Sequence, residues 1–196
     1  MNIANKLTVS RIFAAGVFVA LLLAEFPLSN LIALVVFIYA CITDWVDGKL
    51  ARRLQVESDF GKLIDPLADK LLIISAFIAF IELPQVALPS WVVILIIGRE
   101  FTITGLRLLA ANKGIIIPAG WWGKNKTISQ IVSILSILVY LTVIDLQTAC
   151  AFMEIPLWAG AIYYYYVVFV VLVTVVLTVM SGYVYMKKNW HLISEY

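Results

Sequence analysis

The chain has 196 residues, of which 63% are hydrophobic and only 13% are charged, and its formal net charge is +2. Soluble domains carry charges at about a quarter of their positions, so this composition excludes an ordinary soluble protein and indicates a polytopic membrane protein. We expect membrane lipids around the chain and no nucleic-acid partner.

Six apolar segments follow one another along the sequence. Each is near the length of ~20 residues that crosses a hydrocarbon core of ~30 Å, although aspartates shorten the second. The segments cover residues 12–29, 30–47, 66–83, 90–111, 127–145 and 160–186. Since we find no internal repeat, low-complexity tract or soluble domain, the sequence predicts an all-α polytopic membrane protein. Its six transmembrane helices form a single domain, residues 1–196.

The first ten residues, MNIANKLTVS, are too short and too polar for a secretory signal peptide, and no cleavage site precedes the first apolar segment. Ile3, Leu7 and Ile12 would share one helical face, which favours an N-terminal interfacial helix leading into the membrane. On composition alone, a frayed terminus explains this segment equally well.

Basic residues alternate between the two sides of the predicted membrane. Lys or Arg residues occur at both ends of the chain and in the connections after the second and fourth segments, whereas the connections after the first, third and fifth contain none. By the positive-inside rule, both termini and the connection between the second and third segments face the cytoplasm.

Two pairs of aspartates flank that connection. Asp44 and Asp47 are three residues apart and Asp65 and Asp69 are four apart, so each pair shares one face if its segment is helical. Carboxylates without His or Cys favour magnesium, manganese or calcium. Charged loop residues between two spans are the simpler alternative, but they need no carboxylates in register on both flanking helices. The ~20 Å of apolar helix beyond each pair places the carboxylates beneath the cytoplasmic headgroups, in a polar cavity.

A second group of charges lies in and after the fourth segment, in the runs GREFTITGLR and GKNKT. An Arg within the membrane normally faces a protein interior or a water-filled cavity. Arg99 is therefore either a structural partner of Glu100 or of an aspartate, or a bidentate ligand of a phosphate. Arg107 fits a phosphate ligand or an interfacial anchor, and composition alone favours anchoring for Lys124 and Lys126.

The aspartate stretch fills every fixed position of the motif D-x2-D-G-x2-A-R-x8-G-x3-D-x3-D. The matching residues are Asp44, Asp47, Gly48, Ala51, Arg52, Gly61, Asp65 and Asp69. The segment therefore resembles the CDP-alcohol phosphatidyltransferases. The runs NKLTVSR, GREFTITGLRLLAANKG and GKNKT are similar to those of the bacterial phosphatidylglycerophosphate synthases within that family.

This resemblance implies an activity and its partners. The phosphatidyl group of CDP-diacylglycerol would pass to sn-glycerol 3-phosphate with release of CMP, at a site facing the cytoplasm in the bacterial cytoplasmic membrane. It also implies two divalent cations, Mg²⁺ or Mn²⁺, and favours a homodimer.

The resemblance likewise implies roles for individual residues. Asp44, Asp47, Asp65 and Asp69 would bind the metal ions, and Asp69 would also act as the general base. Gly48, Ala51, Arg52 and Gly61 would line the pocket for the CDP-linked lipid. Arg99, Arg107 and Lys126 would bind the phosphate of the acceptor.

Two other functions stay open from the sequence. The same chemistry could serve another acceptor, such as phosphatidylglycerol, inositol phosphate or serine. Alternatively, intramembrane acids could form the path of a divalent-cation transporter. The clustering of the charged sites towards one side, with no acidic path to the outer face, counts against transport.

Overall fold

The computed structural model describes residues 3–24, 26–54, 59–112, 114–115, 117–118, 120–149 and 156–190. Within these ranges, the side chains of residues 3–9, 11, 44–54, 59–69, 112 and 157 fall outside the description. The described residues form six α-helices and no strand, which confirms the all-α prediction for this part of the chain. The helices are α1 (Ile3–Leu22), α2 (Ser29–Leu54), α3 (Asp59–Ile81), α4 (Ser90–Asn112), α5 (Trp121–Ala149) and α6 (Leu157–Lys188).

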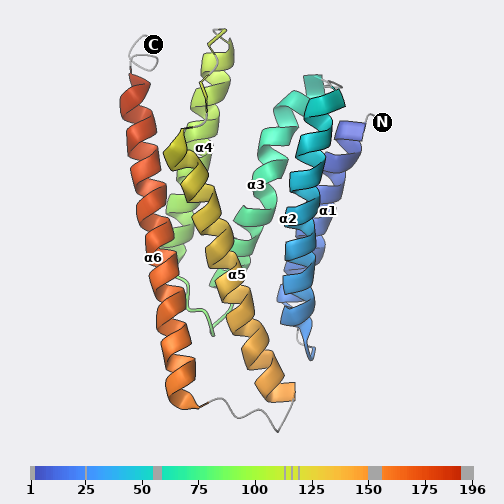
Figure 1. Cartoon of the computed structure of the whole chain (residues 1–196), viewed down its shortest axis with the longest axis vertical. Coiled ribbons are helices and arrows are strands. Elements are labelled where there is room, and N and C mark those ends of the chain that lie inside the picture. The colour runs from blue at the N-terminus through green and yellow to red at the C-terminus, as the bar shows by residue number, and fades with distance from the viewer. Residues whose placement is uncertain are drawn as a thin grey trace.

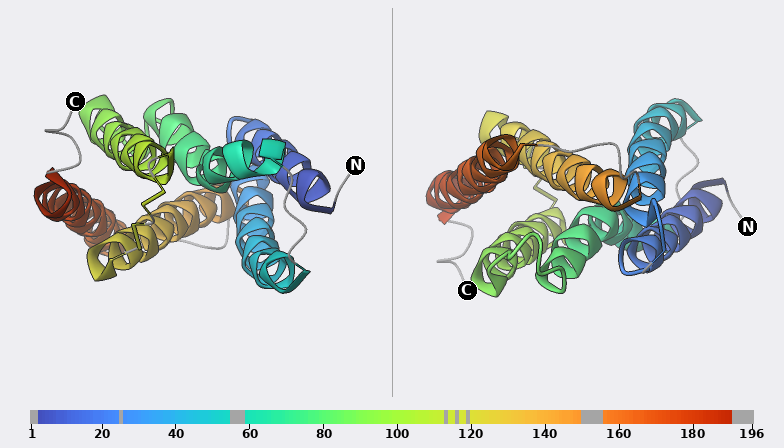
Figure 2. Two further views of the ribbon diagram at one scale, coloured as in Figure 1. Left: turned by 90° about the horizontal axis from the view of Figure 1, so that it is seen from above. Right: turned by 90° about the horizontal axis from the view of Figure 1, so that it is seen from below.

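Successive helices run in opposite directions, as Figure 1 shows. The starts of α1, α3 and α5 and the ends of α2, α4 and α6 all lie at the same end of the bundle. Viewed along the bundle, the helices form two rows, with α1, α3 and α4 in one row and α2, α5 and α6 in the other (Figure 2). The two rows pack together through α1 with α2, α3 with α5, and α4 with α6.

Aromatic and branched side chains fill the space between the rows. Phe18 of α1 and Phe37 of α2 are fully buried, with ring centroids 5.5 Å apart. Phe77 and Phe80 of α3 are also fully buried and meet edge to face, a favourable geometry for aromatic rings. Ile134 and its neighbours on α5 complete this core.

Hydroxyl groups join α5 to α6. The Ser133 and Thr174 hydroxyls are 2.8 Å apart, and the Thr174 hydroxyl also donates a hydrogen bond to the Ser129 carbonyl. The Ser133 hydroxyl lies within hydrogen-bonding distance of the Val170 carbonyl as well. Both side chains are fully buried. Small hydroxyl-bearing residues of this kind let helices approach closely where the surroundings are apolar.

The helices differ from the predicted segments mainly at their ends. The first segment was expected to continue to residue 29, but α1 ends at Leu22. Pro27 cannot donate a backbone hydrogen bond and Leu28 has a left-handed φ of 66°, so a helix cannot run on to residue 29. In contrast, α2 continues to Leu54, α3 already begins at Asp59 and α5 already begins at Trp121. Hydropathy marks only the apolar part of a helix, so it misses these polar turns. The backbone is helical from Ile3, so the described part of the N-terminal segment continues into α1.

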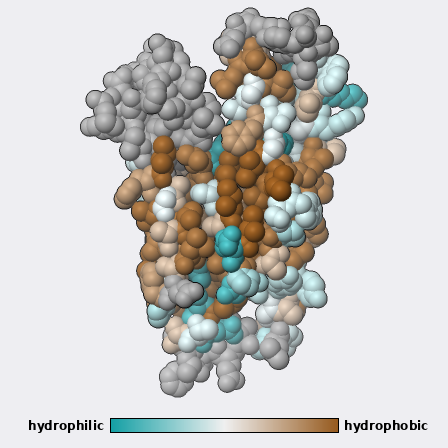
Figure 3. All heavy atoms as spheres, turned by 180° about the vertical axis from the view of Figure 1, so that it is seen from behind, coloured by the Kyte–Doolittle hydropathy of each residue, from teal (hydrophilic) through white to brown (hydrophobic). Residues whose placement is uncertain are grey.

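Two of the described helical segments, Trp121–Ala149 and Trp158–Lys188, are long and apolar enough to cross a membrane. Shorter apolar helices cover Ile12–Leu22, Ser29–Thr43 and Lys70–Ile81. Large apolar side chains are exposed on several helices, including Val35, Ile94 and Phe169. Figure 3 shows that apolar side chains cover much of the middle of one face, as expected of a protein associated with a membrane.

Candidate acceptor site and the aspartate helices

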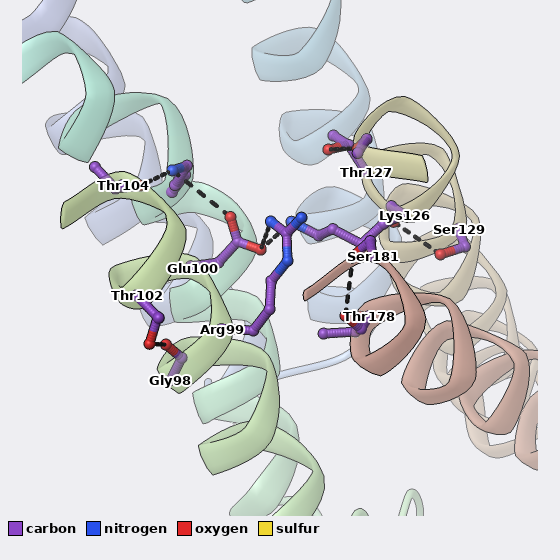
Figure 4. A network of polar contacts seen from close by, with 12 residues as sticks. Gly98, Arg99, Glu100, Thr102, Thr104, Lys126, Thr127, Ser129, Thr178 and Ser181 are labelled. Carbon is purple, nitrogen blue, oxygen red and sulfur yellow. Dashed lines mark hydrogen bonds and ion pairs between the residues drawn. The ribbon is translucent and has the colours of Figure 1, made fainter. Parts of the chain in front are cut away.

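Glu100 lies at the centre of a cluster of charged side chains between the two helix rows (Figure 4). Its Oε1 accepts a hydrogen bond from Lys126 Nζ of α5 and lies 3.4 Å from Arg99 Nη1 of α4. Its Oε2 lies 3.6 Å from Lys70 Nζ of α3. A single carboxylate therefore connects side chains from three helices.

Burial of the side chains varies across this cluster. The exposed fraction is only 3% for Lys126 and 6% for Glu100, whereas it is 13% for Arg99 and 30% for Lys70. Lys126 and Glu100 thus form an inner ion pair, and Lys70 and Arg99 lie on the more open side. The three cations and one carboxylate carry two net positive charges, and charges that are largely removed from water attract an anion more strongly.

The neighbouring residues hold these side chains in place. Thr104 lies one turn after Glu100 on α4, and its hydroxyl accepts a hydrogen bond from Lys70 Nζ. Gly182 of α6 faces the stem of Arg99, since a Cβ built at Gly182 would lie 3.3 Å from Arg99 Cγ. The absence of a side chain at residue 182 therefore leaves room for the Arg99 side chain between α4 and α6.

Arg107 has a different partner. Its Nε donates a hydrogen bond to the Tyr185 hydroxyl of α6 over 3.3 Å, and its guanidinium carbon lies 5.5 Å from the centre of the Tyr185 ring. Arg107 is exposed and lies about two turns along α4 from Arg99. The structure thus brings Arg99 and Lys126 together at Glu100, and it attaches Arg107 to Tyr185.

The residues of the aspartate motif lie on two helices at the same end of the bundle. The backbone is helical at Asp44 and Asp47 in α2 and at Asp65 and Asp69 in α3, so the condition for each pair to share a face is met. Of the other motif residues, Gly48, Ala51 and Arg52 lie in α2 and Gly61 lies in α3. All of these side chains fall outside the described residues. Elsewhere, the side chains that the structure describes contain no group of three His, Cys, Asp or Glu residues that could hold a metal ion.

The sequence predicted neither that Lys70 belongs to this charged cluster nor that Glu100 lies at its centre. Two adjacent pairs of residues were hints, because Lys70 directly follows Asp69 and Glu100 directly follows Arg99. Neither hint shows that the two side chains meet, because Lys70 and Glu100 belong to different helices. The expected ion pair of Arg99 with Glu100 is present, and it does not exclude a phosphate-binding role for Arg99.

Comparison with known proteins identifies the family. The sequence matches the family model of CDP-alcohol phosphatidyltransferases over residues 1–180, a range that includes the aspartate motif and the charged cluster. The chain belongs to this family. The family expectation drawn from the motif is therefore confirmed, and the CDP-alcohol phosphatidyltransferases are generally dependent on divalent metal ions.

Several bacterial relatives match most of the chain. It is 37% identical to the CDP-diacylglycerol–glycerol-3-phosphate 3-phosphatidyltransferase of Bacillus subtilis over 201 residues, which covers 96% of this chain and 95% of that protein. A protein of the same name from Rickettsia bellii is 33% identical, with 95% and 94% covered. The probable phosphatidylglycerophosphate synthase of Mycobacterium tuberculosis is 43% identical over 136 residues, or 68% of this chain and 64% of that protein.

Proposed function

We propose that the protein transfers the phosphatidyl group of CDP-diacylglycerol to sn-glycerol 3-phosphate, which gives phosphatidylglycerophosphate and CMP. The names of the relatives that match almost the full length of the chain support this donor and this acceptor. The structural observation that carries the proposal is the charged cluster around Glu100. An excess of cations beside the aspartate helices suits an acceptor that itself carries a phosphate.

In the proposed topology, all six helices cross the bacterial cytoplasmic membrane. Both termini and the aspartate end of the bundle face the cytoplasm. The distribution of Lys and Arg residues supports this orientation, and so does the alternation of helix direction in Figure 1. Glu100 lies ten residues after Ser90, or about 15 Å of helix, and Lys70 lies eleven residues before Ile81, or about 16 Å. The cluster would then lie near the middle of the membrane, at the floor of a cavity that opens to the cytoplasm.

The four aspartates are the proposed ligands of two divalent cations, Mg²⁺ or Mn²⁺. This donor set suits hard cations, which prefer carboxylate oxygens, and the helical backbone presents each pair on one face. When bound, the cations would neutralise the pyrophosphate and the departing CMP. Gly48, Ala51, Arg52 and Gly61 would line the pocket for the CDP-linked lipid.

The chain's own residues would carry the transfer itself. The 1-hydroxyl oxygen of glycerol 3-phosphate attacks the phosphatidyl phosphorus while Asp69 accepts the hydroxyl proton. The bond from that phosphorus to the oxygen shared with the cytidylyl phosphate breaks, and CMP leaves with that oxygen. Arg99, Arg107 and Lys126 would supply the positive charge at the acceptor's phosphate, so positioning and electrostatics carry the reaction.

The site would also have partners outside the chain. Membrane lipids would surround the bundle, and we propose that two copies of the chain form a homodimer.

The test is release of CMP from CDP-diacylglycerol by purified protein, with and without magnesium or manganese. Glycerol 3-phosphate, inositol phosphate, serine and phosphatidylglycerol are offered in turn, and Asp69→Asn is the control. Metal-dependent release with glycerol 3-phosphate only, lost in the variant, is the expected result. Release with a different acceptor would keep the transferase chemistry and overturn the proposed acceptor. If no acceptor supports release, the proposed function is wrong.

A further inference from the structure

The three cations of the cluster already bind one anion, which is the carboxylate of Glu100 itself. Both carboxylate oxygens of Glu100 are engaged, Oε1 by Lys126 and Arg99 and Oε2 by Lys70. A phosphate that enters from the open side of the cluster would need the same Lys70 and Arg99 donors. The carboxylate and the phosphate would therefore compete.

We propose that Glu100 is a positioning residue of the acceptor site, which holds Lys70 and Arg99 in the empty site and competes with the acceptor's phosphate for them. This inference rests on the proposed function and deepens it. Glu100 also limits the charge of the four-residue cluster to two net positive charges. That value matches a phosphomonoester, which carries about −1.5 to −2 at neutral pH.

The three cations differ in how deeply they are buried, and we infer different roles for them. Lys126 is almost completely buried and contacts Glu100 directly, so it neutralises this carboxylate and acts on the acceptor through it. Lys70 and Arg99 retain exposed surface and are the groups that a phosphate can reach. Lys70 thus joins Arg99 as a residue that contacts the acceptor.

Buried donors without partners support an anion at this place. Arg99 Nε is buried and has no hydrogen-bond partner among the described residues, and the same holds for Gln130 Nε2. Gln130 follows Lys126 by one turn of α5, on the same face of that helix. An unpaired buried donor is costly, and an anion bound at the cluster would supply the missing partner of Arg99 Nε. Arg99 Nε can supply the second bond of a bidentate contact to a phosphate.

Competition with Glu100 makes the site selective by charge. A phosphomonoester dianion matches the two net positive charges and can replace the carboxylate at Lys70 and Arg99. A phosphodiester carries a single negative charge and serine carries no net charge, so each replaces the carboxylate less well. Free inorganic phosphate has the same chemistry as the acceptor's phosphate and should inhibit the reaction.

The test compares Glu100→Gln with wild type and with two controls. Glu100→Asp keeps the charge, and Glu82→Gln removes an exposed carboxylate beyond the far end of α3. Removing the negative charge of Glu100 should lower the KM for glycerol 3-phosphate about tenfold and strengthen inhibition by inorganic phosphate by about the same factor. The KM for CDP-diacylglycerol should not change. Glu82→Gln should stay within about twofold of wild type, and Glu100→Asp should lower the KM for glycerol 3-phosphate less than Glu100→Gln does, because it keeps the negative charge.

A purely structural role for Glu100 gives a different pattern. In that case Glu100→Gln would raise the KM for glycerol 3-phosphate, leave it unchanged or raise both KM values together, and each of these results overturns the proposal. If Glu100→Gln does not fold, Lys70→Met gives the opposite test. Loss of this cation should raise the KM for glycerol 3-phosphate about tenfold, while the KM for CDP-diacylglycerol stays constant. An unchanged KM for glycerol 3-phosphate in Lys70→Met would refute the proposal.

Binding can also be measured without turnover. Inorganic phosphate should raise the unfolding temperature of wild-type protein, and it should do so at lower concentration in Glu100→Gln. If wild type transfers to no acceptor but phosphate stabilises both proteins in this order, the proposed function fails, and only the competition of Glu100 with phosphate for Lys70 and Arg99 stands. If phosphate stabilises neither protein, the role of Glu100 is wrong, whatever acceptor the enzyme uses.

Discussion

The inner ion pair of Lys126 and Glu100 gives a sharp prediction about stability. The change is Lys126→Met, which keeps most of the side-chain volume and removes the cation closest to Glu100. Removing one partner of a buried pair costs about 3–5 kcal/mol, because the remaining charge stays buried and unpaired. Arg99 and Lys70 remain at 3.4 and 3.6 Å from Glu100. Because these two cations still compensate the Glu100 charge, we expect the free energy of unfolding to fall by about 2–3 kcal/mol, at or below the lower limit of that range.

For a chain of this length, that loss corresponds to a fall of about 6–9 °C in unfolding temperature. The assay is thermal unfolding of purified protein in detergent without substrates. Lys124→Met is the matched control, because Lys124 is exposed on the same turn of α5, and its effect should be within about 0.5 kcal/mol of zero.

The double variant Lys126→Met with Glu100→Gln isolates the interaction itself. Glu100→Gln removes the charge that Lys126→Met leaves unpaired. The double variant should therefore lose about 1–2 kcal/mol less free energy of unfolding than the two single losses add up to. If the two effects add within about 0.5 kcal/mol, the pair does not interact energetically, and our account of the cluster is wrong.

Three further predictions concern other parts of the molecule. Removal of divalent cations with EDTA should abolish CMP release, and added Mg²⁺ or Mn²⁺ should restore it; activity that persists in EDTA would contradict the proposed role of the aspartates. Gly182→Val should displace the Arg99 side chain and raise the KM for glycerol 3-phosphate, whereas Gly160→Ala, where a Cβ meets nothing within 4 Å, should leave it unchanged. Equal effects of these two changes would refute the contact. Asp145→Ala should lower stability by about 1 kcal/mol, because Asp145 Oδ2 accepts the Asn30 backbone N–H at the start of α2 over 3.1 Å. An unchanged unfolding temperature would show that this hydrogen bond contributes little.

The sequence predicted the helices better than their ends. Apolar runs near the length of a membrane span indicate helices whatever the tertiary contacts are, so all six apolar segments overlap an observed helix. The first predicted segment runs past the helix as far as residue 29, where hydropathy could not show that Leu28 adopts a left-handed conformation, which is uncommon for leucine. The polar ends of α2 and α3 lack the apolar pattern that marks a span.

The sequence also predicted one part of the candidate site better than the other. The family could be predicted from the aspartates, because their fixed spacing matches a known motif, whereas their role as metal ligands stays a prediction. The partners of the basic residues could not be predicted, because they depend on which helices become neighbours. Lys126 reaches Glu100 across 26 positions of sequence, and Arg107 reaches Tyr185 across 78. No periodicity within a single helix contains this information.

The hydroxyl contacts between α5 and α6 have a consequence for how the chain assembles. In lipid, apolar surface alone does not drive two helices together, so the bonds of Ser133 and Thr174 favour one partner over the surrounding acyl chains. Because α5 and α6 are adjacent in sequence, this hairpin can form as soon as both helices are inserted, without first closing a long loop between distant helices. Replacing Ser133 by Ala together with Thr174 by Val should therefore reduce the share of newly synthesised chains that reach the native fold, more than it reduces the turnover of those that do.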